Sequence, residues 1–333
     1  MDALHGVRAW LPPDARVNVP AVYYFDSALH AVIMDDAGLH AATLKGALLA
    51  GQIPTPRAAA LGTELGQFLR GLHTWGRGTE EGGKLRDALG ANVFARDIYA
   101  LVTYGRLGAT LRTPGSTAGV QEPLPALGDE PLGVSEETLR VVEALAERRS
   151  AQIRDVRGET LVMGDFWPGN VLVGVEDNDS PTLVVDWEIA RPGLAGVDVG
   201  QFCAELATLR RLHPDRAEAA GEVLKNFVHV YFAGDVGPEA DERRRVALGH
   251  FGVHLAVWTP RAQWSAGVHA KRGLVMDGVK CLVEAADPDR IWTDEELVDR
   301  FMGRNVEQHN GSPYDKFRSG GTTDIIRDSI RRG

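Results

Sequence analysis

The chain has 333 residues, of which 44% are hydrophobic and 25% are charged, and its formal net charge at pH 7 is −10. A chain of this length and hydrophobicity can bury a large core, in one large domain or in two modest ones. The acidic balance argues against a nucleic-acid partner, which needs a basic surface, and it is compatible with a cationic substrate.

Targeting and redox signals favour a cytoplasmic protein. The first ten residues lack the basic-then-apolar pattern of a signal peptide, and no apolar run approaches the length of a membrane span. The two cysteines, Cys203 and Cys281, lie far apart in the sequence and are expected to be free thiols in a reducing compartment. We therefore expect a cytoplasmic location and no membrane partner, whereas the composition does not indicate an oligomeric state.

The first fifty residues predict one short helix and two strands, because apolar runs alternate there with turn residues. The helix is expected at 2–10, and the strands at 17–25 and 31–34. A polar turn, Asp35 to Gly38, follows the second strand.

A longer helix is predicted to begin at Thr55-Pro56, with an apolar stripe that ends before Gly76. Within it, His73 is expected at the edge of the core rather than as a ligand or base. The glycine-rich stretch 76–83 carries two glutamates, which would repel phosphate, and it does not lead from a strand into a helix. It is therefore predicted to be a loop.

Residues 106–134 are rich in Pro, Gly, Thr and Ala and predict a long loop, after which a helix begins near Ser135. Two apolar, β-branched runs separated by a turn-like stretch then predict a hairpin of buried strands. The runs span 171–175 and 183–187. Further helices are expected at 197–212, 215–232, 239–258 and 266–285, with a capping box at Thr293 before a last helix and a polar tail from 303 onward.

The predicted hairpin gathers three oxygen-bearing side chains at one end. Asp165 and Asn170 lie in the loop before its first strand, and Asp186 lies at the end of its second strand. Carboxylate and amide oxygens are the ligands that suit a hard cation such as Mg²⁺.

The same residues carry a family resemblance. Gly164-Asp165 followed by Asn170, an apolar strand and Val-Asp186-Trp-Glu188 resembles the catalytic core of the aminoglycoside phosphotransferase and choline kinase family. Gly196-Val-Asp198-Val-Gly200 is similar to the family motif whose Asp braces the catalytic loop. The resemblance implies an α+β, protein-kinase-like, two-lobed fold with a reduced amino-terminal strand lobe and a large, mostly helical carboxy-terminal lobe.

The resemblance also implies roles for these residues. Asp165 would be the catalytic base that accepts the proton of the attacking hydroxyl, while Asn170 and Asp186 would hold Mg²⁺ on the phosphates of ATP. Glu188 is a further candidate for a second ion. The alternative from the residues alone is that Asp165 and Asn170 form a turn and that Asp186 is an ordinary carboxylate at the end of a strand.

Residues 19–26 with 32–38 are similar to the last two strands and the hinge of the kinase amino-terminal lobe. The resemblance implies that the Asp35 carbonyl and the Ala37 N–H bind adenine, although a strand running into a turn would give the same short pattern. The family resemblance also divides the chain into a remnant of the amino-terminal lobe with the hinge (1–38), a phosphotransferase lobe (39–302) and a loosely held tail (303–333).

The amino-terminal part also departs from the family. Residues 1–18 contain neither a glycine-rich phosphate loop nor a strand lysine, the first lysine is Lys45, and Asp2 is a short stand-in for the partner glutamate. Either the chain lacks the first part of its lobe (a truncated gene model, a fragment or an alternative start), or it is a kinase-like protein that has lost it. Met163 stands at the usual histidine position, fills its space without donating its hydrogen bond, and is predicted to reduce order or rate.

We therefore predict an ATP- and Mg²⁺-dependent phosphotransferase that acts on a hydroxyl of a small molecule. A kinase-like pseudoenzyme or nucleotide-binding module and an unrelated Mg²⁺-dependent hydrolase remain alternatives.

Trp258 and Trp264 flank a segment where the family builds its substrate pocket, and their faces suit a cationic group, although core packing fits equally. His250 and His254 lack the intervening glutamate of a zinc-protease helix, so a zinc site is not expected.

Overall fold

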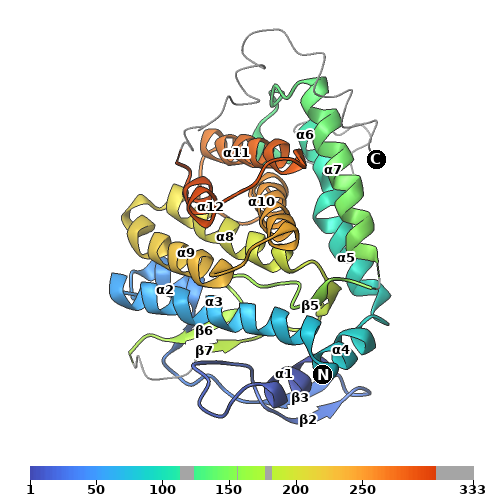
Figure 1. Ribbon diagram of the computed structural model, residues 1–333. Coiled ribbons are helices and arrows are strands. Elements are labelled where there is room, and N and C mark those ends of the chain that lie inside the picture. The colour runs from blue at the N-terminus through green and yellow to red at the C-terminus, as the bar shows by residue number, and fades with distance from the viewer. Residues whose placement is uncertain (113–123, 156, 177–181, 305–333) are drawn as a thin grey trace.

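The computed structural model describes residues 1–112, 124–155, 157–176 and 182–304. Helices make up most of this fold, and the strands labelled β2, β3, β6 and β7 lie below the long helix α3 (Thr55–Gly78) in Figure 1. The described α-helices are α1 (Asp2–Trp10), α2 (Leu44–Ala50), α3 (Thr55–Gly78), α4 (Glu80–Leu89), α5 (Val93–Val102), α6 (Leu107–Arg112), α7 (Glu136–Arg154), α8 (Ala195–Leu212), α9 (Ala217–Phe232), α10 (Pro238–Trp258), α11 (Val268–Ala286) and α12 (Asp294–Phe301). The described strands are β1 (Val17–Asn18), β2 (Val22–Asp26), β3 (Ala31–Met34), β4 (Ala41–Thr43), β5 (Thr160–Val162), β6 (Val171–Gly174), β7 (Thr182–Val184) and β8 (Arg191–Gly193).

The central sheet has the order β1-β7-β6-β4. Strands β6 and β7 pair antiparallel, with Val171 opposite Val184, so the predicted hairpin of buried strands is confirmed. Its connecting turn, 177–181, lies outside the described residues. Strand β1 pairs parallel with β7, with Val17 opposite Thr182, and β4 pairs antiparallel with β6. This sheet therefore joins the amino-terminal segment of the chain to its middle, at the base of the helical body.

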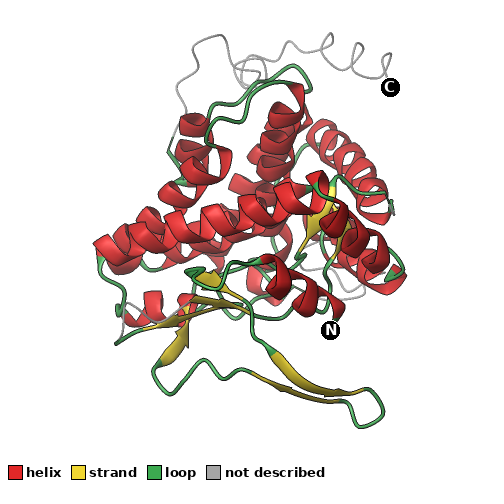
Figure 2. Ribbon diagram, turned by 60° about the horizontal axis from the view of Figure 1, so that its bottom comes forward, coloured by secondary structure: helices red, strands yellow, loops and turns green. Residues whose placement is uncertain are grey.

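The prediction of a single strand over 17–25 was wrong. The chain leaves the central sheet after Asn18, and β2 begins at Val22 in a separate antiparallel pair with β3. Pro20 lies in the gap, and proline has no N–H group with which to continue a ladder of hydrogen bonds. Figure 2 shows the β2–β3 pair extending away from the helical body. Its apolar side chains are correspondingly exposed, Tyr23 by 70% and Ile33 by 57%.

The helical part is built by close helix pairs. Helix α3 packs along α9, and α10 packs against both α8 and α11. Gly196 and Gly200 allow the close approach of α8 to α10, because a Cβ atom at either position would come within 2.5 Å of a carbonyl oxygen of α10, that of Arg243 or of Ala247. These two glycines therefore place the intervening residue, Asp198, in the fully buried centre of the molecule.

The helices predicted between 197 and 285 are confirmed within a few residues at their ends, as is the capping box at Thr293. The loop predicted for 76–83 was wrong: α3 continues to Gly78 and α4 starts at Glu80. The Thr79 hydroxyl caps α4 by accepting a hydrogen bond from Gly82 N at 3.1 Å.

The loop predicted for 106–134 was wrong in part. Its first residues form α6, and Pro125–Leu127 form a short 3₁₀ helix, while 113–123 lie outside the described residues. The predicted tail from 303 lies outside them beyond Arg304. Among the helices that the structure describes, none has both the length and the apolar character needed to cross a bilayer. The fold is thus of the mixed α+β class that the sequence predicts, with a predominantly helical body.

Candidate active site

The loop that follows β5 is anchored on the buried carboxylate of Asp198. Oδ2 of Asp198 accepts a hydrogen bond from the backbone N of Met163, and Oδ1 accepts one from that of Gly164, both at 2.9 Å. Hydrogen bonds to a charged acceptor are stronger than neutral ones, and here they are shielded from water. Asp198 therefore holds the backbone immediately before Asp165, the geometry expected of a brace for this loop.

His73, on α3, lies behind this brace. Its Nε2 atom lies 3.2 Å from Oδ2 of Asp198, and its Nδ1 atom lies 2.7 Å from the hydroxyl of Tyr231 on α9. The histidine is 3% exposed, so it is fully inside the core rather than at its edge. Met163 is also buried and contributes its backbone N–H to Asp198. The loop is therefore tied to α3 and α9 through Asp198 and His73.

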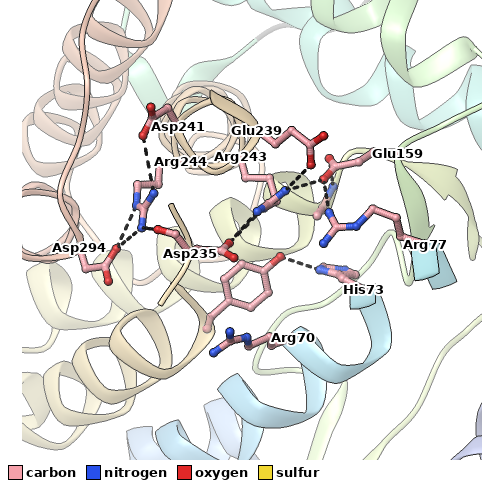
Figure 3. Close-up of polar contacts among 12 residues, drawn as sticks. Arg70, His73, Arg77, Glu159, Asp235, Glu239, Asp241, Arg243, Arg244 and Asp294 are labelled. Atoms are coloured by element: carbon pink, nitrogen blue, oxygen red, sulfur yellow. Dashed lines mark hydrogen bonds and ion pairs between the residues drawn. The ribbon is translucent and has the colours of Figure 1, made fainter. Parts of the chain in front are cut away.

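A cluster of ion pairs surrounds the same region, and Figure 3 shows it next to His73. Arg243 of α10 contacts Asp235 at 2.9 Å and Glu159 at 3.4 Å, and Glu159 also pairs with Arg77 of α3 at 3.0 Å. Glu159 immediately precedes β5 and accepts a hydrogen bond from Ala195 N at the start of α8. The cluster therefore links α3, β5, α8 and α10, the elements that position the candidate site.

Asp165 is half-buried and accepts two side-chain hydrogen bonds. Gln201 donates from Nε2 to Oδ1 at 2.6 Å, and Asn170 donates from Nδ2 to Oδ2 at 3.0 Å. Burial raises the pKa of the Asp165 carboxyl above its ordinary value, and the two hydrogen bonds offset only part of that increase. The result is a carboxylate with fixed orientation and increased basicity.

Asn170 lies beside Asp165, as the sequence predicts. Its Nδ2 group bonds both the backbone carbonyl and the carboxylate of Asp165, each at 3.0 Å, so its Oδ1 atom faces away from Asp165. The backbone of Asn170 accepts a hydrogen bond from Val185 N at 2.9 Å, which joins the loop to the end of β7.

Asp186 follows β7 in an unusual backbone conformation, with φ of 69°. This left-handed region is uncommon for a residue with a side chain and often marks a functional site. The conformation leaves Asp186 exposed while the next residue, Trp187, is buried and packs edge-on against Phe68. The Asp186 carboxylate is close enough to Asp165 for its charge to contribute to the raised pKa of Asp165. Glu188 is exposed.

The hinge residues lie apart from this group, at the end of β3. The Asp35 carboxylate accepts hydrogen bonds from Ala21 N at 2.7 Å and from the Tyr23 hydroxyl, and these bonds lower its pKa. Asp35 and Ala37 are both partly exposed. The side chain of Asp35 thus links the end of β3 to the start of β2.

A second group of polar and aromatic side chains lies one helical turn along α8 from Gln201. Glu205 is 7% exposed; its Oε1 atom lies 2.9 Å from Nε2 of His254, and its Oε2 atom lies 2.9 Å from Nζ of Lys45. Burial alone would raise the pKa of Glu205, but the contacts with His254 and Lys45 prevail and hold it below its ordinary value. Glu205 is therefore a buried carboxylate with two cationic or proton-donating partners.

Two tryptophan rings complete this second group. Nζ of Lys45 lies 3.8 Å from the ring centre of Trp264 and 4.9 Å from that of Trp167. Trp167 belongs to the same loop as Asp165, and its ring lies against Gly169, where a Cβ atom would collide with it. We call Trp167, Trp264 and Glu205 the ammonium cage. The sequence suggested that Trp258 and Trp264 hold a cationic group. Trp264 contacts the Lys45 ammonium, whereas Trp258 stacks on His254.

The sequence did not reveal Gln201, Glu205 or the role of Lys45. Because α8 is buried along most of its length, its sequence has no polar stripe that would mark a functional face. The one available signal was the spacing of four residues between Gln201 and Glu205, which places both on the same face of the helix. A groove of about 800 Å³ lies elsewhere, between α1, α3 and α9, and is lined by Trp10, Arg70 and Trp75 among others. None of the candidate site residues lines it.

The described residues contain no group of three or more His, Cys, Asp or Glu side chains placed to hold a metal ion. Mg²⁺ is usually bound through one or two protein oxygens together with substrate phosphates and water, so Asn170 and Asp186 fit a Mg²⁺–nucleotide complex.

Comparison with known proteins gives the following relationships. The phosphotransferase enzyme family matches residues 2–239. The 4-hydroxytryptamine kinase of Psilocybe cyanescens is 25% identical over 280 residues, which cover 83% of this chain and 69% of that enzyme. The 4-hydroxytryptamine kinase of Psilocybe cubensis is 27% identical over 259 residues, 76% of this chain and 63% of that enzyme.

Similar solved structures include a choline/ethanolamine kinase family protein from Mesorhizobium loti, with a TM-score of 0.43 and 17% identity over 91% of this chain and 83% of that one. An ethanolamine kinase from Plasmodium vivax has a TM-score of 0.41 and 12% identity over 86% of this chain and 70% of that one. The family match spans most of the chain and includes the whole segment from Asp165 to Asp198. The chain therefore belongs to the phosphotransferase enzyme family.

Proposed function

We propose that the protein is an ATP- and Mg²⁺-dependent kinase that transfers a phosphoryl group to a hydroxyl of a small molecule. The observation that carries this proposal is the orientation of Asp165 by Gln201 and Asn170, in a loop whose backbone is held by Asp198. Membership of the phosphotransferase enzyme family supports the reaction class. In this class of reaction, positioning and electrostatic stabilisation supply most of the rate enhancement.

Asp165 acts as the general base in this proposal. Its carboxylate accepts the proton of the acceptor hydroxyl as that oxygen bonds to the γ-phosphorus of ATP, and ADP leaves. A base works best when its pKa approaches the working pH, and burial moves the pKa of Asp165 in that direction. The two hydrogen bonds on Asp165 keep its carboxylate turned to one position.

Asn170 Oδ1 and the carboxylate of Asp186 would hold the Mg²⁺ ion. When bound, the ion neutralises charge on the β- and γ-phosphates. The exposed position of Asp186, set by its left-handed backbone, leaves its carboxylate accessible to a nucleotide in solution. Adenine would be bound by the backbone carbonyl of Asp35 and the N–H of Ala37 at the hinge.

The acceptor in this proposal is a hydroxylated amine. The relatives named as 4-hydroxytryptamine kinases act on a molecule with both a hydroxyl and an amine. In this chain, Gln201 faces Asp165 and Glu205 belongs to the ammonium cage, four residues along the same helix. Four residues of helix correspond to about 6 Å. An acceptor could thus place its hydroxyl at Asp165 and its ammonium toward the cage.

A nucleotide-binding protein without transferase activity is the second candidate function. One observation favours it: the ammonium of Lys45 contacts Glu205 at 2.9 Å and two tryptophan rings, and is thereby engaged away from a phosphate. A kinase strand lysine normally contacts the α- and β-phosphates.

Phosphoryl transfer from ATP to hydroxytryptamines and amino alcohols, followed by mass spectrometry of the acceptor, separates the two functions. The kinase proposal predicts Mg²⁺-dependent addition of one phosphoryl group by the unaltered chain and much slower addition by Asp165→Asn. Nucleotide binding without any transfer across such a panel would favour the second function.

A further inference from the structure

We propose that Lys45 is a tethered occupant of the ammonium cage, and that a cationic acceptor enters by displacing its side chain. The Lys45 ammonium contacts all three members of the cage: the Trp264 ring at 3.8 Å, the Trp167 ring at 4.9 Å and Glu205 at 2.9 Å. The entry of an acceptor into the cage rests on the proposed function, in which the acceptor hydroxyl lies at Asp165, beside the cage.

The cage has the chemistry of a site for an ammonium ion. An aromatic face attracts a cation through its quadrupole, most strongly when water is excluded, and Trp264 is only 6% exposed. The carboxylate of Glu205 supplies the opposite charge from a fully buried position. His254 fixes its other oxygen at 2.9 Å, so the carboxylate cannot turn away when its cation changes.

The attachment of Lys45 allows its side chain to leave while its backbone stays. The backbone N of Lys45 donates to the carbonyl of Pro168 at 3.0 Å, and Thr43 caps the same helix by accepting from Gly46 N. These bonds hold α2 against the loop of Asp165. The side chain of Lys45 is 23% exposed, so its flexible stem has a path to solvent.

Exchange of one ammonium for another preserves the charge balance of the cage. Removing the partner of a buried carboxylate is costly, because the charge is left without compensation. An incoming ammonium replaces Lys45 at Glu205 and avoids this cost, whereas a neutral molecule does not. Lys45 therefore lowers the affinity of the cage for cationic occupants, whereas a neutral molecule leaves Glu205 without a partner and is not expected to enter, with or without Lys45.

The probe for this exchange is n-butylammonium, which reproduces the four-carbon stem and ammonium of lysine. Its binding is followed without nucleotide, by tryptophan fluorescence and by the shift in melting temperature, in the unaltered chain and in Lys45→Ala. Lys45→Met serves as a second variant, which retains the apolar stem. Lys84→Ala is the matched control, because Lys84 is a well-exposed lysine of α4 that pairs with Glu80.

We expect both Lys45 variants to bind n-butylammonium about tenfold more tightly than the unaltered chain, because the tethered ammonium no longer competes for the cation–π contacts and the ion pair; tenfold corresponds to about 1.4 kcal/mol. Lys84→Ala should match the unaltered chain. Glu205→Gln added to Lys45→Ala should remove the gain, and neutral n-butanol should bind all variants equally.

Equal n-butylammonium affinity in the unaltered chain and in folded Lys45→Met would overturn the inference, as would an equal gain for n-butanol. Mg·ATP titration of the same samples separates this inference from the proposed function. If the unaltered chain does not bind Mg·ATP but the Lys45 variants gain n-butylammonium affinity as predicted, the result counts against the kinase proposal alone. If Mg·ATP binds and the n-butylammonium affinity is the same in the variants and the unaltered chain, the result counts against the displacement of Lys45 alone.

Discussion

Gln201 donates a hydrogen bond of 2.6 Å from Nε2 to Oδ1 of Asp165. The amide oxygen of Gln201 accepts from the hydroxyl of Tyr99 at 3.3 Å, and that hydroxyl lies 2.9 Å from Nε2 of His250. The orientation of the candidate base is thus fixed through α8, α5 and α10. This contact uses His250 as a buried hydrogen-bonding residue.

The first prediction concerns the pH dependence of phosphoryl transfer. Burial is the largest influence on the pKa of Asp165 and raises it, whereas the hydrogen bond from Gln201 is the next largest and lowers it. Gln201→Leu should therefore raise this pKa further. Because the base must be ionised, the acid limb of the kcat/KM profile should move to higher pH.

The control is Gln67→Leu, which alters an exposed residue of α3 and should leave the profile in place. A downward shift of the acid limb in Gln201→Leu would contradict the assignment of Asp165 as the base. An unchanged limb would show that Gln201 does not tune the reacting carboxylate.

The second prediction separates chemistry from binding. Asp165→Asn keeps the size of the side chain but removes its capacity to accept the hydroxyl proton. We expect kcat to fall by about 10²–10⁴-fold, the range typical of general acid–base catalysis. The dissociation constant of Mg·ATP, measured by calorimetry, should change little. Full activity in Asp165→Asn would rule out the base role, and loss of folding would appear as a changed circular dichroism spectrum.

The third prediction concerns the brace behind the loop. His73→Phe preserves the aromatic volume but removes one contact of Asp198 and the partner of the Tyr231 hydroxyl. Asp198 keeps its hydrogen bonds from Met163 N and Gly164 N, so the Tyr231 hydroxyl alone is left unsatisfied. An unsatisfied buried polar group costs about 1–3 kcal/mol, and we expect the free energy of unfolding in urea to fall by that amount. His5→Phe, at an exposed position of α1, is the control. Unchanged stability in His73→Phe would mean that these contacts do not anchor the loop.

The sequence predicted the proximity of those candidate site residues that lie close to one another along the chain. Asp165, Asn170 and Asp186 lie within one hairpin and its flanking loop, so local strand patterning placed them together. The contacts of Asp198 with the loop follow from the family motif, which the resemblance supplied. The roles of these residues, the hinge contacts of Asp35 and Ala37 and the division at residue 38 stay predictions.

The remaining contacts depend on tertiary packing that no local pattern encodes. Lys45 and Glu205 are separated by 160 residues and meet because α2 is hydrogen-bonded to the loop of Trp167. The stretch 76–83 was misassigned for a different, local reason: glycine is a poor helix former in isolation, yet Gly82 lies in the first turn of α4, where its N–H bonds the capping Thr79 hydroxyl.

Calorimetric titration of Mg·ATP into this 333-residue chain and into Asp186→Ala tests the central claim most directly. Asp129→Ala, which removes an exposed carboxylate in the segment before α7, is the control. We predict binding by the unaltered chain and by the control, and loss of that binding in Asp186→Ala or when Mg²⁺ is chelated. Absence of binding by the unaltered chain, or equal binding by Asp186→Ala, would contradict the proposed kinase site.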